Sequence, residues 1–391
     1  MTSLRPATLL LTLLASSAWV VPSCAASTVV DPQTAPAVLT RLAAGDVLRL
    51  KPGVYNGLSF RHVKRWDPAR PIVITSADPT RPAIVTDFTV RGARGLVFRD
   101  VTLHATNPNT RGYGFVFHGC EAVALERVKV HGSLDGDPSN DPYGVQFRDC
   151  HDVSVTGSEF TELNRGLLVG PASKVRVEDN RLHLLRSDGM DFAQVQDVRI
   201  VGNEIRDIFR VGTDHPDGIQ FWTSATTAPS RNILIARNLI DRGRGLAMQG
   251  IFIRDEAGHP YDGLTIEDNL ILGTGWNALR IVGHTGKPTT GVTIRGNELI
   301  TFREVDGVPT RELLTYILLQ NVNGAEVTAN RAAQISFDKV EGLTQRGNVI
   351  TKPVRDKGAA ALANWTARHR PADRIAALPA EELPGAPKSK R

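Results

Sequence analysis

Short stretches in which apolar and polar residues alternate recur along the chain, as in VRIVGNEI around Asn203. Alternation over four to six positions, with many β-branched residues, predicts short β-strands rather than helices. The steps from Ser158 to Asn180 and on to Asn203 are 22 and 23 residues, and later steps are longer. A phrase that returns at such intervals is typical of a solenoid with inserted loops. The copies centre on Asn180, Asn203, Asn238, Asn269, Asn297 and Asn348, with degenerate copies at Ser158, Arg127 and Asp100.

The asparagine of each copy follows a strand, where a tight bend tolerates a left-handed backbone. Coils stack about 4.8 Å apart, so these asparagines could form a hydrogen-bonded ladder inside the solenoid. The pattern predicts an all-β fold, a right-handed parallel β-helix, over residues 27–353. Residues 32–45 have helical spacing and a closing glycine, which predicts an N-terminal capping helix. Residues 354–391 are expected to form a C-terminal tail that is partly helical or disordered.

A second phrase, glycine followed by apolar, variable and apolar residues, occurs once in each coil. Alignment of these glycines maps the surface, because side chains alternate between the two faces of a strand. The outward position holds Val116, Gln146, Leu168, Asp191, Gln220, Phe252 and Arg280. The turn position before the glycine holds Tyr113, Tyr143, Arg165, Asp188, Asp217, Gln249 and Asn277. Both columns are polar in the middle coils.

Three aspartates coincide in these columns: Asp188 and Asp191 in one coil, and Asp217 in the next. Like charges one coil apart raise one another's pKa unless a cation or a proton lies between them. One Asp-Gly pair is a common turn, but three acids in register with Arg165 and Arg280 nearby favour a functional site. We predict as catalytic residues Asp188, Asp191, Asp217, His215 and Arg280.

Other side chains on or beside the same strands are candidates for binding substrate. Aromatic rings can stack on sugar rings, although Trp222 and Trp276 could equally be buried. Basic side chains can bind anionic groups or take part in acid–base chemistry, and His259 is a further candidate of this kind. The predicted binding residues are Arg165, Gln220, Trp222, Gln249, Arg254, Trp276, Asn277, His284 and Lys287.

The net charge of +5 favours an anionic partner. The basic residues are scattered without a nucleic-acid module, so we expect an acidic polysaccharide rather than nucleic acid, and a monomeric protein. Residues 1–26 resemble an export signal, which predicts a secreted or periplasmic protein, with lipidation at Cys24 left open. No later apolar run reaches the ~18 residues of a transmembrane segment. Cys120 and Cys150 lack metal-ligand spacing and are expected to be small buried residues, bonded or not.

The segments AAGDVLRLKPGVYNGLSF and RPIVITSADPTRPAIV resemble the N-terminal part of β-helix polysaccharide lyases. The similar families are the alginate lyase and chondroitinase B family and the pectate-lyase-like family. This resemblance implies a pectate-lyase-like solenoid and β-elimination, in which a calcium site or a basic residue neutralises the uronate carboxylate. The catalytic pattern of chondroitinase B does not occur in the sequence.

The middle of the chain resembles a degenerate polygalacturonase site. RSDGMD and HPDGIQ would supply Asp188 and Asp217, whereas Gln249 stands where that family has histidine. NALRIV keeps Arg280 but has Val282 in place of lysine. DHPDG is also similar, in a different residue order, to the Asp-Pro-His-Asp motif of alginate C5-epimerases.

These patterns leave several activities open. A secreted lyase acting on a uronate-containing polysaccharide is the first expectation, with Asp188, Asp191 and Asp217 as candidate ligands of Ca²⁺ and otherwise no cofactor. A glycoside hydrolase would instead use the paired aspartates as acid and nucleophile, or as acid and base. A uronate C5-epimerase and a non-catalytic glycan-binding β-helix are the remaining alternatives.

Overall fold

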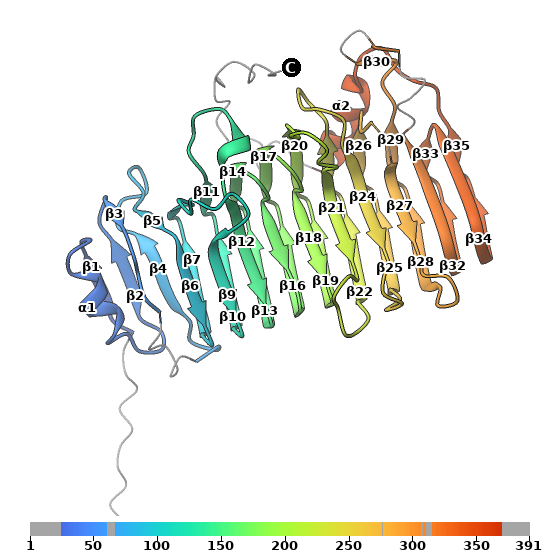
Figure 1. The fold of residues 1–391 in the computed structure, drawn as a ribbon. Coiled ribbons are helices and arrows are strands. Elements are labelled where there is room, and N and C mark those ends of the chain that lie inside the picture. The colour runs from blue at the N-terminus through green and yellow to red at the C-terminus, as the bar shows by residue number, and fades with distance from the viewer. Residues whose placement is uncertain (1–24, 61–66, 276, 306–307, 310–314, 370–391) are drawn as a thin grey trace, which may run out of the picture.

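A computed structural model of the protein describes residues 25–60, 67–275, 277–305, 308–309 and 315–369. The chain winds into an elongated stack of coils with the N-terminal coils at one end and the last strands at the other (Figure 1). Each full coil contributes one strand to each of three parallel sheets, and every strand pairs with its counterpart one coil away. The fold is a right-handed parallel β-helix, as predicted.

The strands of the first sheet begin at the turn column or, in β6, β15 and β18, two residues after it. They are β6 (Phe88–Arg91), β9 (Tyr113–His118), β12 (Tyr143–Arg148), β15 (Leu167–Val169), β18 (Met190–Ala193), β21 (Asp217–Trp222), β24 (Gln249–Arg254) and β27 (Asn277–Val282). Two long strands, β32 (Tyr316–Thr328) and β34 (Gln334–Arg346), run through the first sheet and into the second.

The second sheet carries the alternating phrases recognised first in the sequence. Its strands are β1 (Ser27–Val30), β2 (Val47–Leu50), β4 (Ile72–Ser76), β7 (Arg94–Arg99), β10 (Glu121–Glu126), β13 (Cys150–Thr156), β16 (Ala172–Glu178), β19 (Val195–Val201), β22 (Arg231–Ala236), β25 (Asp262–Glu267) and β28 (Thr289–Arg295). The apolar positions of this sheet point inward and form stacked columns of buried side chains. One such column is Val123, Val153, Val175, Val198, Ile233, Leu264 and Val292.

The third sheet has the shortest strands. They are β3 (Val54–Tyr55), β5 (Ile84–Thr86), β8 (Thr102–His104), β11 (Lys129–His131), β14 (Glu159–Leu163), β17 (Arg181–Leu185), β20 (Glu204–Ile208), β23 (Leu239–Asp241), β26 (Leu270–Leu272), β29 (Glu298–Ile300), β33 (Arg331–Ala332) and β35 (Val349–Ile350). Outside the three sheets lie a small antiparallel pair, β30 (Glu304–Val305) and β31 (Val308–Pro309), and the 3₁₀ turn η1 (Pro138–Asn140).

The asparagine ladder forms at the bend between the second and third sheets. The backbone N–H of Asn203 donates to Asn238 Oδ1 at 2.9 Å, and its side-chain amide donates to the same atom. The same pattern runs from Asn180 to Asn348, and the N–H of Ser158 donates to Asn180 Oδ1 at the N-terminal end. The ladder also includes Asn330, which the sequence repeat did not identify.

The prediction that the ladder asparagines adopt the left-handed backbone was wrong by one residue. The positive φ belongs to the preceding residue, for example Asp179 (56°) and Gly202 (71°). The asparagine itself must turn its side chain inward to bond the next coil. The same offset means that Asp100 and Arg127 occupy the left-handed position, and Val128 stands at the ladder position, where its N–H donates to Ser158 Oγ.

Helices lie at two places on the solenoid. The capping helix α1 spans Ala35–Leu39, shorter than the predicted 32–45, and lies beside β1 and β2 at the N-terminal end (Figure 1). Helix α2 (Ala359–His369) covers the third sheet near β26 and β29, where Trp365 is buried against Leu272 and Ile300. No helix among the described residues is long and apolar enough to cross a membrane. The predicted export signal falls almost entirely outside the described residues.

Candidate active site

The two columns predicted from the glycine phrases are in register in the structure. In the outward column Gln146 pairs with Leu168, Leu168 with Asp191, and Asp191 with Gln220. The column continues through Phe252 and Arg280. In the turn column, Asp217 at the start of β21 pairs with Gln249 at the start of β24, whereas Arg165 and Asp188 lie two residues before β15 and β18.

Arg165 connects two of the three aspartates. Its guanidinium lies 2.9 Å from Asp188 Oδ2 and 3.1 Å from Asp191 Oδ2. The other oxygen of Asp188 accepts the backbone N–H of Asp217 at 2.9 Å. Because each oxygen of Asp188 faces a cation or an N–H donor, this carboxylate has the surroundings that favour its ionised form.

The third aspartate has a different environment. The side chain of Asp217 is fully buried, and neither of its oxygens accepts a hydrogen bond from a described residue. The nearest basic group recorded beside it is His215, whose Nδ1 lies 4.0 Å from Asp217 Oδ2 and whose side chain is 69% exposed. Asp217 therefore lies beneath a solvent-facing histidine that could relay a proton.

Burial and mutual repulsion dominate the titration of this cluster. Burial raises the pKa of Asp188, and the charge of Arg165 opposes that rise. The pKa of Asp191 is raised well above its ordinary value by burial and by the charge of Asp188. The pKa of Asp217 is also raised well above its ordinary value, by burial and then by the charges of Asp188 and Asp191. The cluster thus combines Asp188, whose charge is compensated by Arg165, with Asp217, whose surroundings favour the protonated form.

The outward-column interpretation of Asp191 needs correction. Asp191 occupies the outward column, but its side chain is fully buried rather than at the surface. Arg165 from the preceding coil lies against it and retains 29% of its own side-chain exposure. Phe252, expected to pack, is buried as well.

Tyrosines flank the arginine on its N-terminal side. The rings of Tyr113 and Tyr143 lie 4.9 Å apart in an edge-on contact, and the Arg165 guanidinium lies 5.5 Å from the Tyr143 ring centre. Burial raises the pKa of Tyr113 well above its ordinary value. The sequence placed both tyrosines in the turn column, but the contact of Tyr143 with Arg165 was not predicted.

Two turns beside the acids are tied together by Arg186, which sequence reasoning missed. Its Nε donates to Asp214 Oδ2 at 2.9 Å, in the turn that leads to His215. Its NH1 donates to the carbonyl of Ser139, in the turn between β11 and β12. An Arg–Asp pair across turns of different length leaves no periodic signal in the sequence.

The remaining predicted residues are spread along the first sheet. Gln249 accepts a hydrogen bond from the Asn277 amide in the next coil, and both side chains are buried. The Arg280 guanidinium lies 5.7 Å from the Phe252 ring centre, and its Nε has no hydrogen-bond partner among the described residues. Gln220 is half-buried beside the acids.

Several predicted binding residues lie farther along the strands. Trp222 is half-buried at the far end of β21, and Arg254 is exposed at the end of β24. His284 and Lys287 face one another across a small turn, and Lys287 Nζ donates to the carbonyl of Gly258. They are not brought together with the aspartates, and Trp276 lies outside the described residues.

The aspartates do not form a ready cation site. Among the described residues no group of three or more His, Cys, Asp and Glu side chains is arranged to hold a metal ion. The guanidinium of Arg165 already supplies positive charge to Asp188 and Asp191. Calcium needs six to eight oxygen ligands around one point, which this arrangement does not offer.

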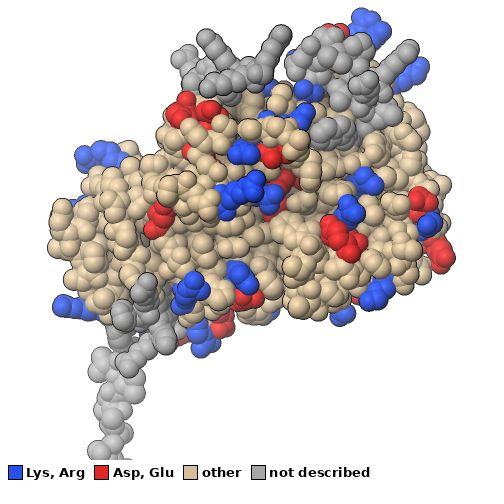
Figure 2. Space-filling model, in the orientation of Figure 1, with Lys and Arg blue, Asp and Glu red and all other residues tan. Residues whose placement is uncertain are grey.

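Charged side chains gather over the middle of the face shown in Figure 2, whereas the N-terminal part of that face has few.

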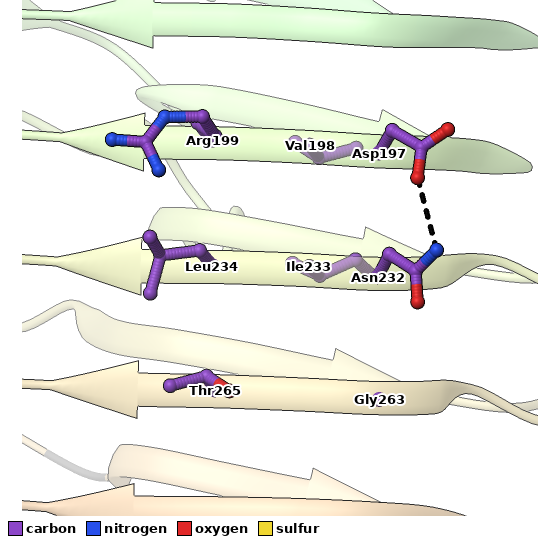
Figure 3. A pocket seen from close by; sticks show the side chains of 8 residues that line it. All are labelled: Asp197, Val198, Arg199, Asn232, Ile233, Leu234, Gly263 and Thr265. Carbon is purple, nitrogen blue, oxygen red and sulfur yellow. Dashed lines mark hydrogen bonds between the residues drawn. The ribbon is translucent and has the colours of Figure 1, made fainter.

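A shallow pocket of about 400 Å³ lies away from the acidic cluster, on the outer face of β19, β22 and β25 (Figure 3). Two of its polar side chains are hydrogen-bonded to each other, since the amide of Asn232 donates to Asp197 Oδ1 at 2.9 Å. Coil-to-coil pairs of this kind cover much of the second sheet, for example Arg199 with Glu178. This pocket is separate from the acidic cluster.

Comparisons with known proteins agree with the architecture. A family model described as "Right handed beta helix region" matches residues 113–299. None of the curated proteins matches the chain significantly in sequence.

Among solved structures, the chain is similar to a GH136 lacto-N-biosidase from Eubacterium ramulus, with a TM-score of 0.51 and 10% identity over 83% of this chain and 68% of that one. It is also similar to the PL6 family alginate lyase AlyGC, with a TM-score of 0.50 and 13% identity over 85% of this chain and 53% of that one. The second is of the class that the N-terminal segment resembles. At these identities the likenesses show the fold, and they establish that this chain is a right-handed parallel β-helix.

Proposed function

We propose that the protein is a carbohydrate-active enzyme that hydrolyses glycosidic bonds with Asp217 and Asp188. The observation that carries the proposal is the unequal environment of these two acids in adjacent coils. Asp188 is paired with Arg165 at 2.9 Å, whereas Asp217 is buried without a hydrogen-bond partner among the described residues. Two carboxyl groups whose surroundings separate their protonation states are the machinery of a glycosidase.

The roles follow from the protonation states. The pKa of Asp217 is raised well above its ordinary value, which favours the protonated form and the role of general acid toward the leaving oxygen. Burial raises the pKa of Asp188 as well, but Arg165 and the N–H of Asp217 oppose that rise and favour the ionised form, which suits the nucleophile or the base that activates water. Exposed His215 returns the proton to Asp217 from solvent.

Substrate access requires movement at the start of β21, because the carboxyl group of Asp217 is fully buried. The adjoining turn carries exposed His215 and is held by the ion pair between Arg186 and Asp214. We infer that the glycan displaces this turn when it binds. A closed site of this kind would exclude water from the reacting glycosidic bond and so strengthen the electrostatic interactions around it.

β-Elimination on a uronate polysaccharide, the first expectation from the sequence, is the second candidate. Arg280 favours it, because its guanidinium lies in the outward column with Nε unpartnered among the described residues, and it could bind a carboxylate. The base would be His215, since an ordinary arginine does not lose its proton near neutral pH. Elimination ranks second because Arg165 is occupied by two carboxylates, and His215, the other basic group beside the acids, lies next to the buried carboxyl group of Asp217 at 4.0 Å.

The test is incubation of the purified protein with neutral oligosaccharides, alginate, polygalacturonate and bacterial exopolysaccharides, each with and without EDTA. Reducing ends and the ultraviolet absorbance of unsaturated uronates are followed together. Hydrolysis yields reducing ends without absorbance, and elimination yields both. Conversion of mannuronate to guluronate without cleavage would indicate an epimerase. Binding without any chemical change would support the glycan-binding alternative and contradict both cleavage proposals.

Loss of cleavage in both Asp188→Ala and Asp217→Ala, with Asp149→Ala as the matched surface control, would link the activity to the cluster. Asp149 is an exposed carboxylate at the bend between β12 and β13, 3.0 Å from His118. We also propose that the protein is exported and that residues 1–26 are removed. The test is to express the chain with residues 1–26 in a bacterial host and to determine the N-terminal sequence of the product.

A further inference from the structure

Cys120 and Cys150 occupy neighbouring coils at the bend between the first and second sheets. Each precedes or begins a strand of the second sheet, and the neighbouring residues Glu121 and His151 are in register. The N–H of His151 donates to the carbonyl of Cys120 at 2.8 Å, so the two backbones are hydrogen-bonded at this point. Both cysteines are buried and present as free thiols.

The two sulfur atoms occupy equivalent positions one coil apart, each near the carbonyl two residues before it, that of His118 for Cys120 and that of Arg148 for Cys150. The thiol of Cys120 lies 3.5 Å from the carbonyl oxygen of His118, and the thiol of Cys150 lies 3.5 Å from that of Phe117. These two carbonyls are consecutive in β9, so Cys150 reaches across the coil boundary toward Cys120. The stacked rings of Phe117 and Phe147, 4.8 Å apart, show how close the two coils are here. Neighbouring strands of a sheet lie about 4.7–4.9 Å apart, and this spacing falls within the Cα–Cα range of about 4.4–6.8 Å that a disulfide accepts.

We propose that Cys120 and Cys150 form a disulfide between coils when the chain folds in the presence of an external disulfide. The thiolate of one cysteine attacks that disulfide, releasing one thiol and forming a mixed disulfide. The second cysteine then displaces the other thiol, so two protein thiols are oxidised and one external disulfide is reduced to two thiols. Because both sulfurs are buried in the folded chain, the reaction belongs to folding, before the two coils close.

The crosslink would brace the coil that supports the candidate site. The segment between the two cysteines includes the turn that contains η1 and the start of β12, where Tyr143 contacts Arg165. A closed loop of this length restricts the unfolded chain and therefore raises the melting temperature.

The test compares wild-type protein refolded with a mixture of oxidised and reduced glutathione against protein refolded with reductant. After blocking of free thiols, trypsin cleaves at Arg127 and Arg148, which separates the two cysteines into different peptides. We expect one crosslinked peptide pair under non-reducing conditions, which disappears on reduction. We also expect a melting temperature several degrees higher for the oxidised protein.

The control is the double variant Cys120→Ala with Cys150→Ala, in which the redox buffer should not change the melting temperature. Two blocked thiols and no crosslinked peptide in the glutathione-refolded wild type would overturn the proposal, whatever the variant does. A crosslinked peptide without a rise in melting temperature would retain the disulfide and refute its bracing role.

Discussion

The charge balance of the acidic cluster depends on Arg165, and substitution of this residue by methionine tests that balance directly. Methionine keeps a long apolar side chain but removes the charge and both ion pairs, at 2.9 Å to Asp188 and 3.1 Å to Asp191. Removal of one partner from a buried ion pair costs about 3–5 kcal/mol, because a charge stays buried without compensation. Arg165 keeps 29% of its side-chain exposure, so we expect a loss near the lower end, ~3 kcal/mol, at neutral pH.

The loss should depend on pH with a defined sign. Burial already raises the pKa values of Asp188 and Asp191, and the variant lacks the arginine that opposes this rise. A carboxyl group whose folded pKa is raised contributes its full stability below the unfolded pKa of about 3.9, and that contribution is lost as the pH rises. The difference between wild type and Arg165→Met should therefore be small near about pH 4 and largest near about pH 8.

The assay is thermal unfolding followed by circular dichroism at one fixed scan rate, because long β-solenoids can unfold irreversibly. Arg199→Met is the matched control, since Arg199 pairs with Glu178 at 3.1 Å on an exposed part of the second sheet. An exposed pair is worth about 0–1 kcal/mol, so the control should change little at either pH. A decrease in melting temperature for Arg165→Met that is equal at both pH values would refute the role of Arg165 as the counter-ion of buried carboxylates.

Three further predictions concern the ladder and the chemistry of the site. Asn238→Ala should lower the free energy of unfolding by about 3–9 kcal/mol, because the backbone N–H of Asn203, one amide N–H of Asn203 and the carbonyl of Ile200 each lose a buried hydrogen bond worth about 1–3 kcal/mol. Asn348→Ala, at the half-buried end of the ladder, should cost about 1 kcal/mol, and equal losses in denaturant unfolding would contradict the ladder argument. Asp217→Asn should reduce kcat by about 10²–10⁴-fold with an unchanged circular dichroism spectrum. The rate of the wild-type protein should fall as the pH rises through the raised pKa of Asp217. A rate that keeps rising with pH would exclude Asp217 as the general acid. Dialysis against EDTA should leave the activity unchanged because Arg165 supplies the positive charge, whereas a loss restored by Ca²⁺ alone would support the calcium site expected from the sequence.

The fold was predictable because a parallel β-helix repeats one local pattern many times. Inward apolar positions and the ladder asparagines recur in each coil, so each copy supports the others. Asn330 was missed because its segment, TANRAA, has alanine two positions after asparagine, where the other copies have leucine or isoleucine. The left-handed residue was misplaced because Asn and the residue before it both tolerate tight bends, and only the ladder bonds distinguish them.

The sequence predicts which residues of the candidate site align between coils, but not how deeply their side chains are buried. Pairing of Asp217 with Gln249 follows from the glycine phrases alone. The burial of Asp191 does not follow, because it depends on which rotamer Arg165 adopts across the coil boundary. The contact of Arg186 with Asp214 joins turns of unequal length and has no sequence period to reveal it. Side-chain contacts between coils are therefore the part of the site that periodicity leaves undetermined.

The order of residues in the turn column explains why the two acids differ. Along this column a tyrosine precedes Arg165, two acids follow it, and amide side chains come after them. The cation thus lies on one side of the acid pair only, beside Asp188, while the side chain next to Asp217 on the far side is the neutral Gln249. Since equivalent positions lie one coil apart, the cation opposes the rise in pKa more strongly at the nearer acid, Asp188, than at the farther one, Asp217. The proposed chemistry depends on the different environments of Asp188 and Asp217. This difference therefore arises from the position of Arg165 at one end of the pair.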